Sequence, residues 1–184
     1  MRATELAHLV LQHAVKPGAW AVDATVGNGY DTRFLAHCVG PAGRVFGFDV
    51  QEAALVAAAE RVHGLSQVTL IHSGHERLLE CIPADAKGRL AAVMFNLGYL
   101  PGGDHSIVTR AETTLTSLGL ALGYLDVGGL ITLVLYPGHL GGADEAAAVK
   151  DFAQHLPADF AVTQHTRINA LHRAPELLVI ERTA

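Results

Sequence analysis

Apolar runs bounded by glycine or proline alternate with alanine-rich segments along the whole sequence. A short continuous or alternating apolar run predicts a strand, and apolar residues three and four positions apart predict a helix. By these criteria we expect strands at residues 20–25, 44–50, 68–73, 90–95, 128–136, 160–168 and 176–183. We expect helices at residues 3–15, 31–38, 51–63, 75–82, 106–125 and 144–156.

Strict alternation of strands and helices is typical of a parallel sheet that is covered by helices on both faces. The segments at 90–95 and 128–136 are almost wholly apolar, which predicts central strands buried on both faces. The last two strands are joined by a short connection and should form an antiparallel hairpin. We therefore expect one α/β domain over residues 1–184, built on a Rossmann-like, seven-stranded and mostly parallel sheet. The apolar stripe of 3–15 is most simply explained by packing on this sheet, and a homodimer through that helix is the alternative.

The composition supports a globular protein, since half of the residues are hydrophobic and 17% are charged. The longest apolar runs, such as 130–135, are too short to cross a bilayer, and the N-terminus lacks the pattern of a secretory signal. Cys38 and Cys81 are isolated, which favours reduced thiols in the cytoplasm. Because there is neither an HExxH motif nor a cluster of cysteine and histidine, we expect no metal site.

The first strand ends in DATVGNGYDT (23–32), at the edge where open parallel sheets bind their ligands. Gly27 and Gly29 would let the backbone turn tightly and approach a ligand. The third glycine of GxGxxG is missing, and Asp23 and Asp31 flank the turn. These carboxylates would disfavour a pyrophosphate and favour a cation. S-adenosylmethionine (SAM) carries a sulfonium and an ammonium, so the segment predicts a SAM site rather than a dinucleotide site.

The second strand ends in FDVQ (48–51), and Asp49 lies near the offset at which a strand-end acid binds ribose hydroxyls. Gln51 would support the ribose or the neighbouring backbone. The alternative for Asp49 is a helix cap. His75 follows the third strand and is a candidate for the adenine rim, although a surface histidine is an equally good interpretation.

The fourth strand ends in FNLGYLPGGDH (95–105), which suits an amine acceptor. An amine must aim its lone pair at the methyl carbon, in line with the departing sulfur. The carbonyl of Asn96, with a nearby backbone carbonyl, could accept the amine hydrogens, and the ring of Tyr99 could face the sulfonium. These two residues are similar in type and spacing to the NPPY motif of amino-group methyltransferases, with Leu97 and Gly98 in place of the prolines. The alternative is a turn cap and a packing aromatic.

Several longer segments carry a closer resemblance. They are DATVGNGYDTRFLA, FGFDVQEAAL, FNLGYLPGGDHSIVT and YPGHLGGADE, together with Thr113-Thr114 and Asn169. Over nearly the whole chain these resemble the bacterial and plastid family of tRNA wobble-uridine methyltransferases, also described as rRNA methylases. The resemblance implies a class I, SAM-dependent enzyme that converts 5-aminomethyl-2-thiouridine to 5-methylaminomethyl-2-thiouridine. His105, where lysine is expected in the family, and HRAP (172–175) depart from its pattern.

Further candidates lie beyond the fifth strand, in YPGH (136–139). Tyr136 and His139 could bind the uracil or accept a proton, with His105 as second choice for the proton; loop-bonded histidines are the alternative. The expected catalytic residues are Asn96, Tyr99 and His139, and the expected substrate-binding residues are Leu97, Gly98, His105, Tyr136 and Asn169. The expected cofactor-binding residues are Asp23, Thr25, Gly27, Asn28, Gly29, Asp31, Thr32, Asp49, Gln51, His75 and Asn96.

The net charge of −5 argues against a protein that coats nucleic acid by bulk electrostatics. The expected partner is the tRNA anticodon stem-loop, held by a small patch, with the wobble base flipped into the pocket. The patch would draw on Arg33, Arg110, Arg167 and Arg173. Three alternatives remain open at this point: a dinucleotide-dependent oxidoreductase, a methyltransferase for another RNA or for a small-molecule or protein amine, and a non-catalytic binding module.

Overall fold

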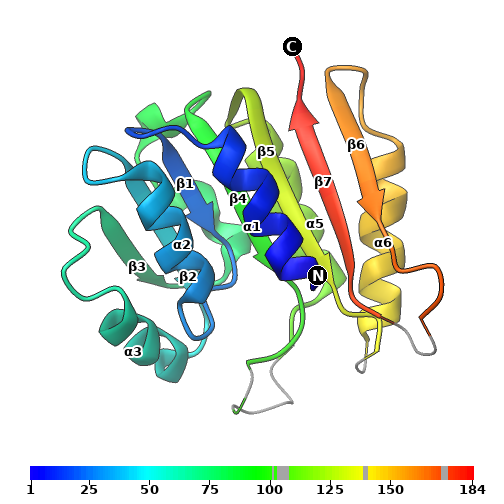
Figure 1. Ribbon diagram of the computed structural model, residues 1–184, viewed down its shortest axis with the longest axis horizontal. Coiled ribbons are helices and arrows are strands. Elements are labelled where there is room, and N and C mark those ends of the chain that lie inside the picture. Colours follow the sequence, from blue (N-terminus) through cyan, green and yellow to red (C-terminus); the bar gives the residue numbers. More distant parts are fainter. Residues whose placement is uncertain (101, 103–107, 139–140, 171–173) are drawn as a thin grey trace.

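A seven-stranded sheet forms the centre of the protein (Figure 1). The computed structural model describes residues 1–100, 102, 108–138, 141–170 and 174–184. The strands are β1 (Trp20–Asp23), β2 (Arg44–Asp49), β3 (Val68–His72), β4 (Leu90–Asn96), β5 (Leu125–Leu135), β6 (Phe160–His165) and β7 (Glu176–Arg182). Their order is β3-β2-β1-β4-β5-β7-β6. The pairs among β1 to β5 are parallel, and β7 is antiparallel to both β5 and β6. This confirms the expected mostly parallel sheet and its closing hairpin.

Helices cover both faces of this sheet. They are α1 (Ala3–Ala14), α2 (Tyr30–Val39), α3 (Glu52–Arg61), α4 (Leu78–Cys81), α5 (Ala111–Leu122) and α6 (Gly142–Gln154), with 3₁₀ turns η1 (His75–Arg77) and η2 (Ala84–Ala86). Figure 1 shows α1, α2 and α3 in front of the sheet and α5 and α6 behind it. None of the helices in the described part of the chain combines the length and the apolar composition needed to cross a membrane.

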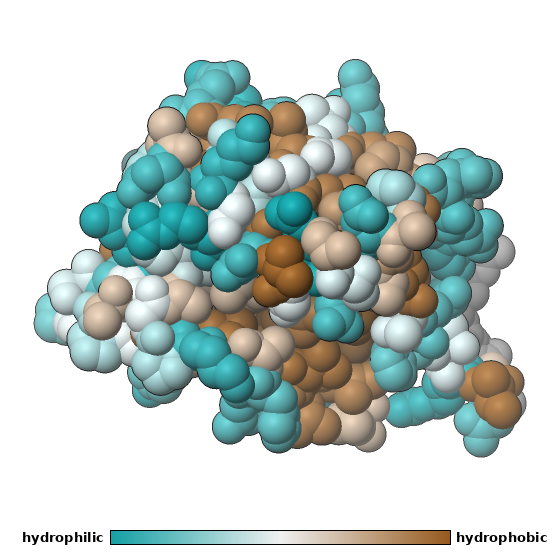
Figure 2. Space-filling view, turned by 90° about the horizontal axis from the view of Figure 1, so that it is seen from above, coloured by the Kyte–Doolittle hydropathy of each residue, from teal (hydrophilic) through white to brown (hydrophobic). Residues whose placement is uncertain are grey.

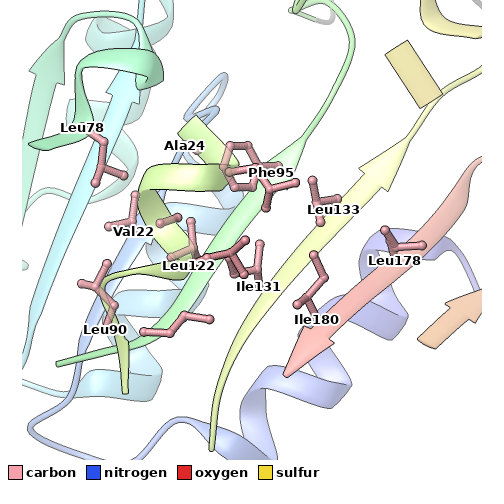
Figure 3. Packing of buried hydrophobic residues seen from close by; sticks show 14 of the residues in the cluster. Val22, Ala24, Leu78, Leu90, Phe95, Leu122, Ile131, Leu133, Leu178 and Ile180 are labelled. Carbon is pink, nitrogen blue, oxygen red and sulfur yellow. The ribbon is translucent and has the colours of Figure 1, made fainter. Parts of the chain in front are cut away.

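The two faces of β4 explain its apolar sequence. Ala92 and Met94 belong to the core under α1 and α2, whereas Val93 and Phe95 belong to the core under α5 and α6. Figure 3 shows part of this second core, in which side chains from β1, β4, β5 and β7 meet those of α4 and α5. A strand buried on both faces needs apolar residues at every position. The helix α1 packs on the first core through Ala7 and Leu11, as the simpler sequence interpretation predicted.

Several boundaries differ from the sequence prediction, and those of three elements have a clear local cause. The helix expected at 106–125 begins only at Ala111, because Val108 pairs with Tyr99 and Arg110 is extended; it ends at Leu122. The strand β5 begins at Leu125, earlier than expected, because a register shift against β4 accommodates the exposed residues 126–128. The helix expected at 75–82 divides into η1 and α4. In each case a local pairing or turn overrides the periodicity of the segment.

The parallel strands β1, β4 and β5 all end at the lower edge of the sheet in Figure 1. The chain's N-terminus and the first turn of α1 lie at that same edge. Figure 2 looks from above onto the opposite edge, where these strands begin and where hydrophobic and hydrophilic residues are mixed. The carboxyl ends of the strands, where open sheets bind ligands, are therefore the place to look for the site.

Candidate active site

The glycine turn, residues 24–30, connects β1 to α2. Gly27 and Gly29 have φ angles of +50° and +78°, which side chains with a Cβ rarely adopt. A Cβ on Gly29 would also lie 2.8 Å from the Cα of Ala58, so α3 can approach only a glycine. The carbonyl of Asn28 accepts a hydrogen bond from Arg61 Nε at 2.6 Å. The turn is thus held against α3, with Gly27 and Asn28 partly exposed.

The buried carboxyl group of Asp23 stabilises this turn through hydrogen bonds. Asp23 Oδ1 accepts a hydrogen bond from the Thr25 amide at 3.1 Å, and Oδ2 accepts one from Thr32 Oγ1 at 2.6 Å. Both Asp23 and Thr32 are fully buried. Burial, with the nearby charge of Asp31, raises the pKa of Asp23 to about 7. Asp23 and Thr32 therefore support the turn from within the protein interior. Their expected contact with a cofactor stays a prediction.

The carboxylate of Asp49 links the end of β2 to the same turn. Its Oδ2 accepts a hydrogen bond from the Gly27 amide at 2.8 Å, and its Oδ1 accepts one from the Gln51 amide at 2.9 Å. Each carboxylate oxygen can accept a second hydrogen bond, and Asp49 is only half-buried. Ordering the start of α3 and binding ribose hydroxyls are therefore compatible tasks for this side chain.

His75 lies beneath the end of β1. Its Nδ1 is 2.9 Å from the Ala24 carbonyl, and its ring meets Phe95 edge to face. Because a carbonyl only accepts, Nδ1 carries the proton and Nε2 is an acceptor, with no partner among the described residues. Burial lowers the pKa of the imidazole. The interpretation of His75 as a surface histidine is wrong, since it is 8% exposed; its contact with adenine stays a prediction.

Asn96, at the end of β4, lies beside the glycine turn. Its backbone N–H donates to Thr25 Oγ1 at 2.7 Å, and its side-chain Nδ2 donates to Asp31 Oδ2 at 3.4 Å. An ionised carboxylate only accepts hydrogen bonds, so the NH₂ group must face Asp31 and Oδ1 must face away from it. The side-chain oxygen is left available to accept hydrogens from an amine.

The acceptor loop, residues 97–110, follows Asn96. Its two sides pair where Gly98 O accepts the Thr109 amide at 2.9 Å and where Tyr99 bridges Val108. Leu97 is 1% exposed and belongs to the core, so its expected contact with the substrate stays a prediction that falls on its backbone. Tyr99 is 42% exposed. Leu100 approaches Gly27, so the loop and the glycine turn are adjacent.

The remaining predicted residues are less closely grouped. Tyr136, just after β5, is half-buried, and its pKa is raised by burial and further by the charge of Asp31. Asn169 is exposed in the connection between β6 and β7, and β5 and β7 separate β6 from β4 in the sheet. The expected roles of His105, His139 and Arg173 fall outside the described residues. Arg33, Arg110 and Arg167 are exposed, but they lie on different elements.

Sequence reasoning missed two residues that the structure adds to this region. His8 of α1 has Nε2 at 2.6 Å from Asp31 Oδ1. Glu145 of α6 is 3% exposed and accepts the hydroxyls of Thr109 and Thr114, each at 2.7 Å. Both residues are polar positions inside helices, where polar residues ordinarily face solvent, so the sequence carried no signal for either contact. Within the described ranges, no group of acidic, histidine and cysteine side chains is arranged to hold a metal ion.

Comparison with known proteins identifies the family of this chain. A protein family described as "Putative rRNA methylase" matches residues 45–181, which is most of the chain. The chain belongs to this family. The crystal structure of a "putative rRNA-methylase" from Clostridium thermocellum is 41% identical, covers 99% of this chain and 98% of its own, and superposes with a TM-score of 0.93. The resemblance that the motifs indicated is therefore confirmed.

Two further relatives bear on the ligand. A "putative methyltransferase" from Streptococcus mutans, solved in complex with S-adenosylhomocysteine (SAH), is 33% identical, with 99% and 98% of the two chains covered and a TM-score of 0.88. The chloroplastic tRNA (mnm(5)s(2)U34)-methyltransferase of Arabidopsis thaliana is 40% identical over 85% of this chain. The chain spans 60% of the length of that relative. The family is one of class I methyltransferases, and its cofactor is SAM.

Proposed function

We propose that this protein methylates the primary amine of 5-aminomethyl-2-thiouridine at the tRNA wobble position, using SAM. The observation that carries the proposal is the Asn96 amide, which Asp31 holds with its oxygen available beside the glycine turn. A nitrogen acceptor needs such an oxygen to orient its hydrogens. The name of the Arabidopsis relative supports the choice of this particular amine.

The residues present fit the cofactor. Gly27 and Asn28 of the glycine turn are partly exposed, and Asp49 has accepting capacity for ribose hydroxyls. The negative charges of Asp31 and Asp49 suit a cationic ligand, which SAM is and a dinucleotide is not. When bound, SAM supplies an activated methyl group on its sulfonium.

On the acceptor side, catalysis would be mostly alignment. Asn96 Oδ1 would accept one hydrogen of the amine and the Leu97 carbonyl another, which turns the lone pair toward the methyl group. Tyr99 would cover the reacting atoms, and Tyr136 and Asn169 would line the space for the base. His139 and His105 stay candidates for receiving the proton that a protonated amine must lose before attack.

The anticodon stem-loop is the partner that this substrate requires. Contact through Arg33, Arg110 and Arg167 would come from separate elements, so we expect a small and salt-sensitive interface rather than a continuous basic face. The cytoplasmic location and the homodimer expected from the sequence stay predictions.

The test combines a gene deletion with a reconstituted reaction. Nucleoside mass spectrometry of tRNA from a deletion strain should show 5-aminomethyl-2-thiouridine in place of its methylated form. Purified protein with SAM should then methylate an anticodon stem-loop that carries the aminomethyl group, and should leave one with unmodified uridine unchanged. Unaltered tRNA in the deletion strain, with methyl transfer to rRNA or to a free amine instead, would refute the tRNA assignment. Calorimetry should detect SAH binding and no NAD(P) binding.

A further inference from the structure

His8 of α1 is fixed to α2 by two different contacts. Its Nε2 lies 2.6 Å from Asp31 Oδ1, and its ring stacks on Phe34 with the centroids 3.9 Å apart and the planes 2° from parallel. Asp31 and Phe34 are one helical turn apart on α2. The side chain of His8 is 30% exposed, so it lies at the rim of the site rather than in the core.

The hydrogen bonds define a chain from α1 to the end of β4. Asp31 Oδ1 faces His8, and Asp31 Oδ2 faces the NH₂ group of Asn96. Because the carboxylate only accepts, His8 must present an N–H at Nε2. One carboxylate therefore receives a donor from each side, and its orientation fixes the orientation of the Asn96 amide.

Asp31 needs such a donor for an electrostatic reason. It is 8% exposed, and it lies close enough to Asp23 for its charge to raise the pKa of that second carboxyl group. Two carboxylates that lie close together at a buried site repel. The N–H of His8 offsets part of this repulsion and holds Asp31 turned toward Asn96.

We propose that His8 is a positioning residue of methyl transfer: by binding Asp31 it keeps the Asn96 amide turned with Oδ1 toward the acceptor amine. The inference rests on the proposed amine methylation. His8 acts through Asp31 and does not itself touch the methyl group. The same contact makes α1, the first element of the chain, part of the acceptor site.

Two substitutions separate the hydrogen bond from the stacking. His8→Phe keeps a ring against Phe34 and removes the donor, whereas His8→Gln keeps an N–H donor and removes the ring. We expect His8→Phe to lower kcat about 10- to 100-fold, with the dissociation constant for SAH changed by less than about threefold. His8→Gln should retain kcat within about threefold of the wild type. Equal activity of His8→Phe and the wild type, or equal loss in both variants, would overturn the proposal.

A second readout does not depend on the substrate. The side-chain NH₂ signals of Asn96, assigned by their loss in Asn96→Ala, report its hydrogen bond to Asp31 in ¹⁵N-edited NMR spectra. They should shift in His8→Phe and stay close to their wild-type positions in His8→Gln. If the wild type fails to methylate the stem-loop, the proposed function fails, but these shifts still test whether His8 orients Asn96 through Asp31. Unchanged Asn96 signals in His8→Phe refute the positioning role even when the wild type is active.

Discussion

The glycine turn and the acceptor loop leave adjacent strands at the same edge of the sheet, yet they are stabilised in different ways. The glycine turn is short, and two acids accept hydrogen bonds from its backbone amides, Asp23 from Thr25 and Asp49 from Gly27. Asp23 also accepts the hydroxyl of Thr32, just after the turn. The acceptor loop is longer, and Thr109 anchors its returning side to Glu145 of α6. At its start, Asn96 depends on Asp31 of α2, and through it on His8 of α1.

The difference matches the two proposed tasks. The cofactor can be bound by a turn whose shape is fixed locally by its glycines and by nearby acidic residues. An acceptor must be aligned to within a fraction of an ångström, so the group that orients it benefits from support by several elements. Substitutions in the glycine turn should therefore affect cofactor affinity and stability, whereas substitutions around the acceptor loop should affect kcat.

The largest effect is expected for Asn96→Ala. Loss of the side-chain oxygen leaves the amine unoriented, so kcat should fall at least about 1000-fold while SAH affinity stays within about threefold. Single-turnover kinetics and calorimetry measure the two quantities. Asp49→Ala is the matched substitution beside the glycine turn, and we expect it to lower the affinity for SAH about 10- to 100-fold. Loss of SAH binding in Asn96→Ala would place Asn96 in the cofactor site instead.

Gly29→Ala should be the most destabilising change in the glycine turn. The new methyl group would meet Ala58 in a backbone conformation at φ +78°, so we expect a loss of about 2–4 kcal/mol in the free energy of unfolding. Gly27→Ala is the control, because the nearest atom to its Cβ is 3.6 Å away and only the left-handed conformation, about 1–2 kcal/mol, opposes it. Urea denaturation should rank the two variants in this order; the reverse ranking would contradict the close approach of α3.

Asp23 should make stability depend on pH. Its pKa is raised from 3.8 to about 7 in the folded protein, so its contribution to stability is complete below pH 3.8 and is lost as the pH rises through about 7. Between about pH 5 and pH 8 the wild type should lose about 3 kcal/mol relative to Asp23→Asn. Urea denaturation of both proteins at the two pH values measures this, with exposed Asp126→Asn as control. Parallel curves for the wild type and Asp23→Asn would show that Asp23 is ionised throughout.

Thr109→Val should have the smallest effect and should fall on the acceptor loop. The substitution leaves one oxygen of buried Glu145 without its donor, which costs about 1–2 kcal/mol of stability. The loosened loop should lower kcat about threefold to tenfold with unchanged SAH affinity. Thr116→Val is the control, because that exposed hydroxyl bonds only the Glu112 carbonyl in its own helix. A larger effect on SAH affinity than on kcat would mean that the two regions are not separable.

The sequence was sufficient for the sheet and its hairpin, and it predicted where the candidate site lies. Those features rest on local patterns, namely the apolar strands, the glycines of the turn, and Asn96 at a strand end. The ribose-binding role of Asp49 stays a prediction, and its two hydrogen-bond partners, Gly27 and Gln51, belong to the same motifs that suggested it.

Contacts between distant helices could be known only from the fold. His8, Asp31 and Asn96 come from three elements, and no periodicity indicates that a polar position of α1 faces α2. The burial of Glu145 and of His75 could likewise not be read from their sequence neighbours. Local patterns record how a segment buries its own apolar face, whereas the partner of a buried polar group depends on how helices pack across the sheet.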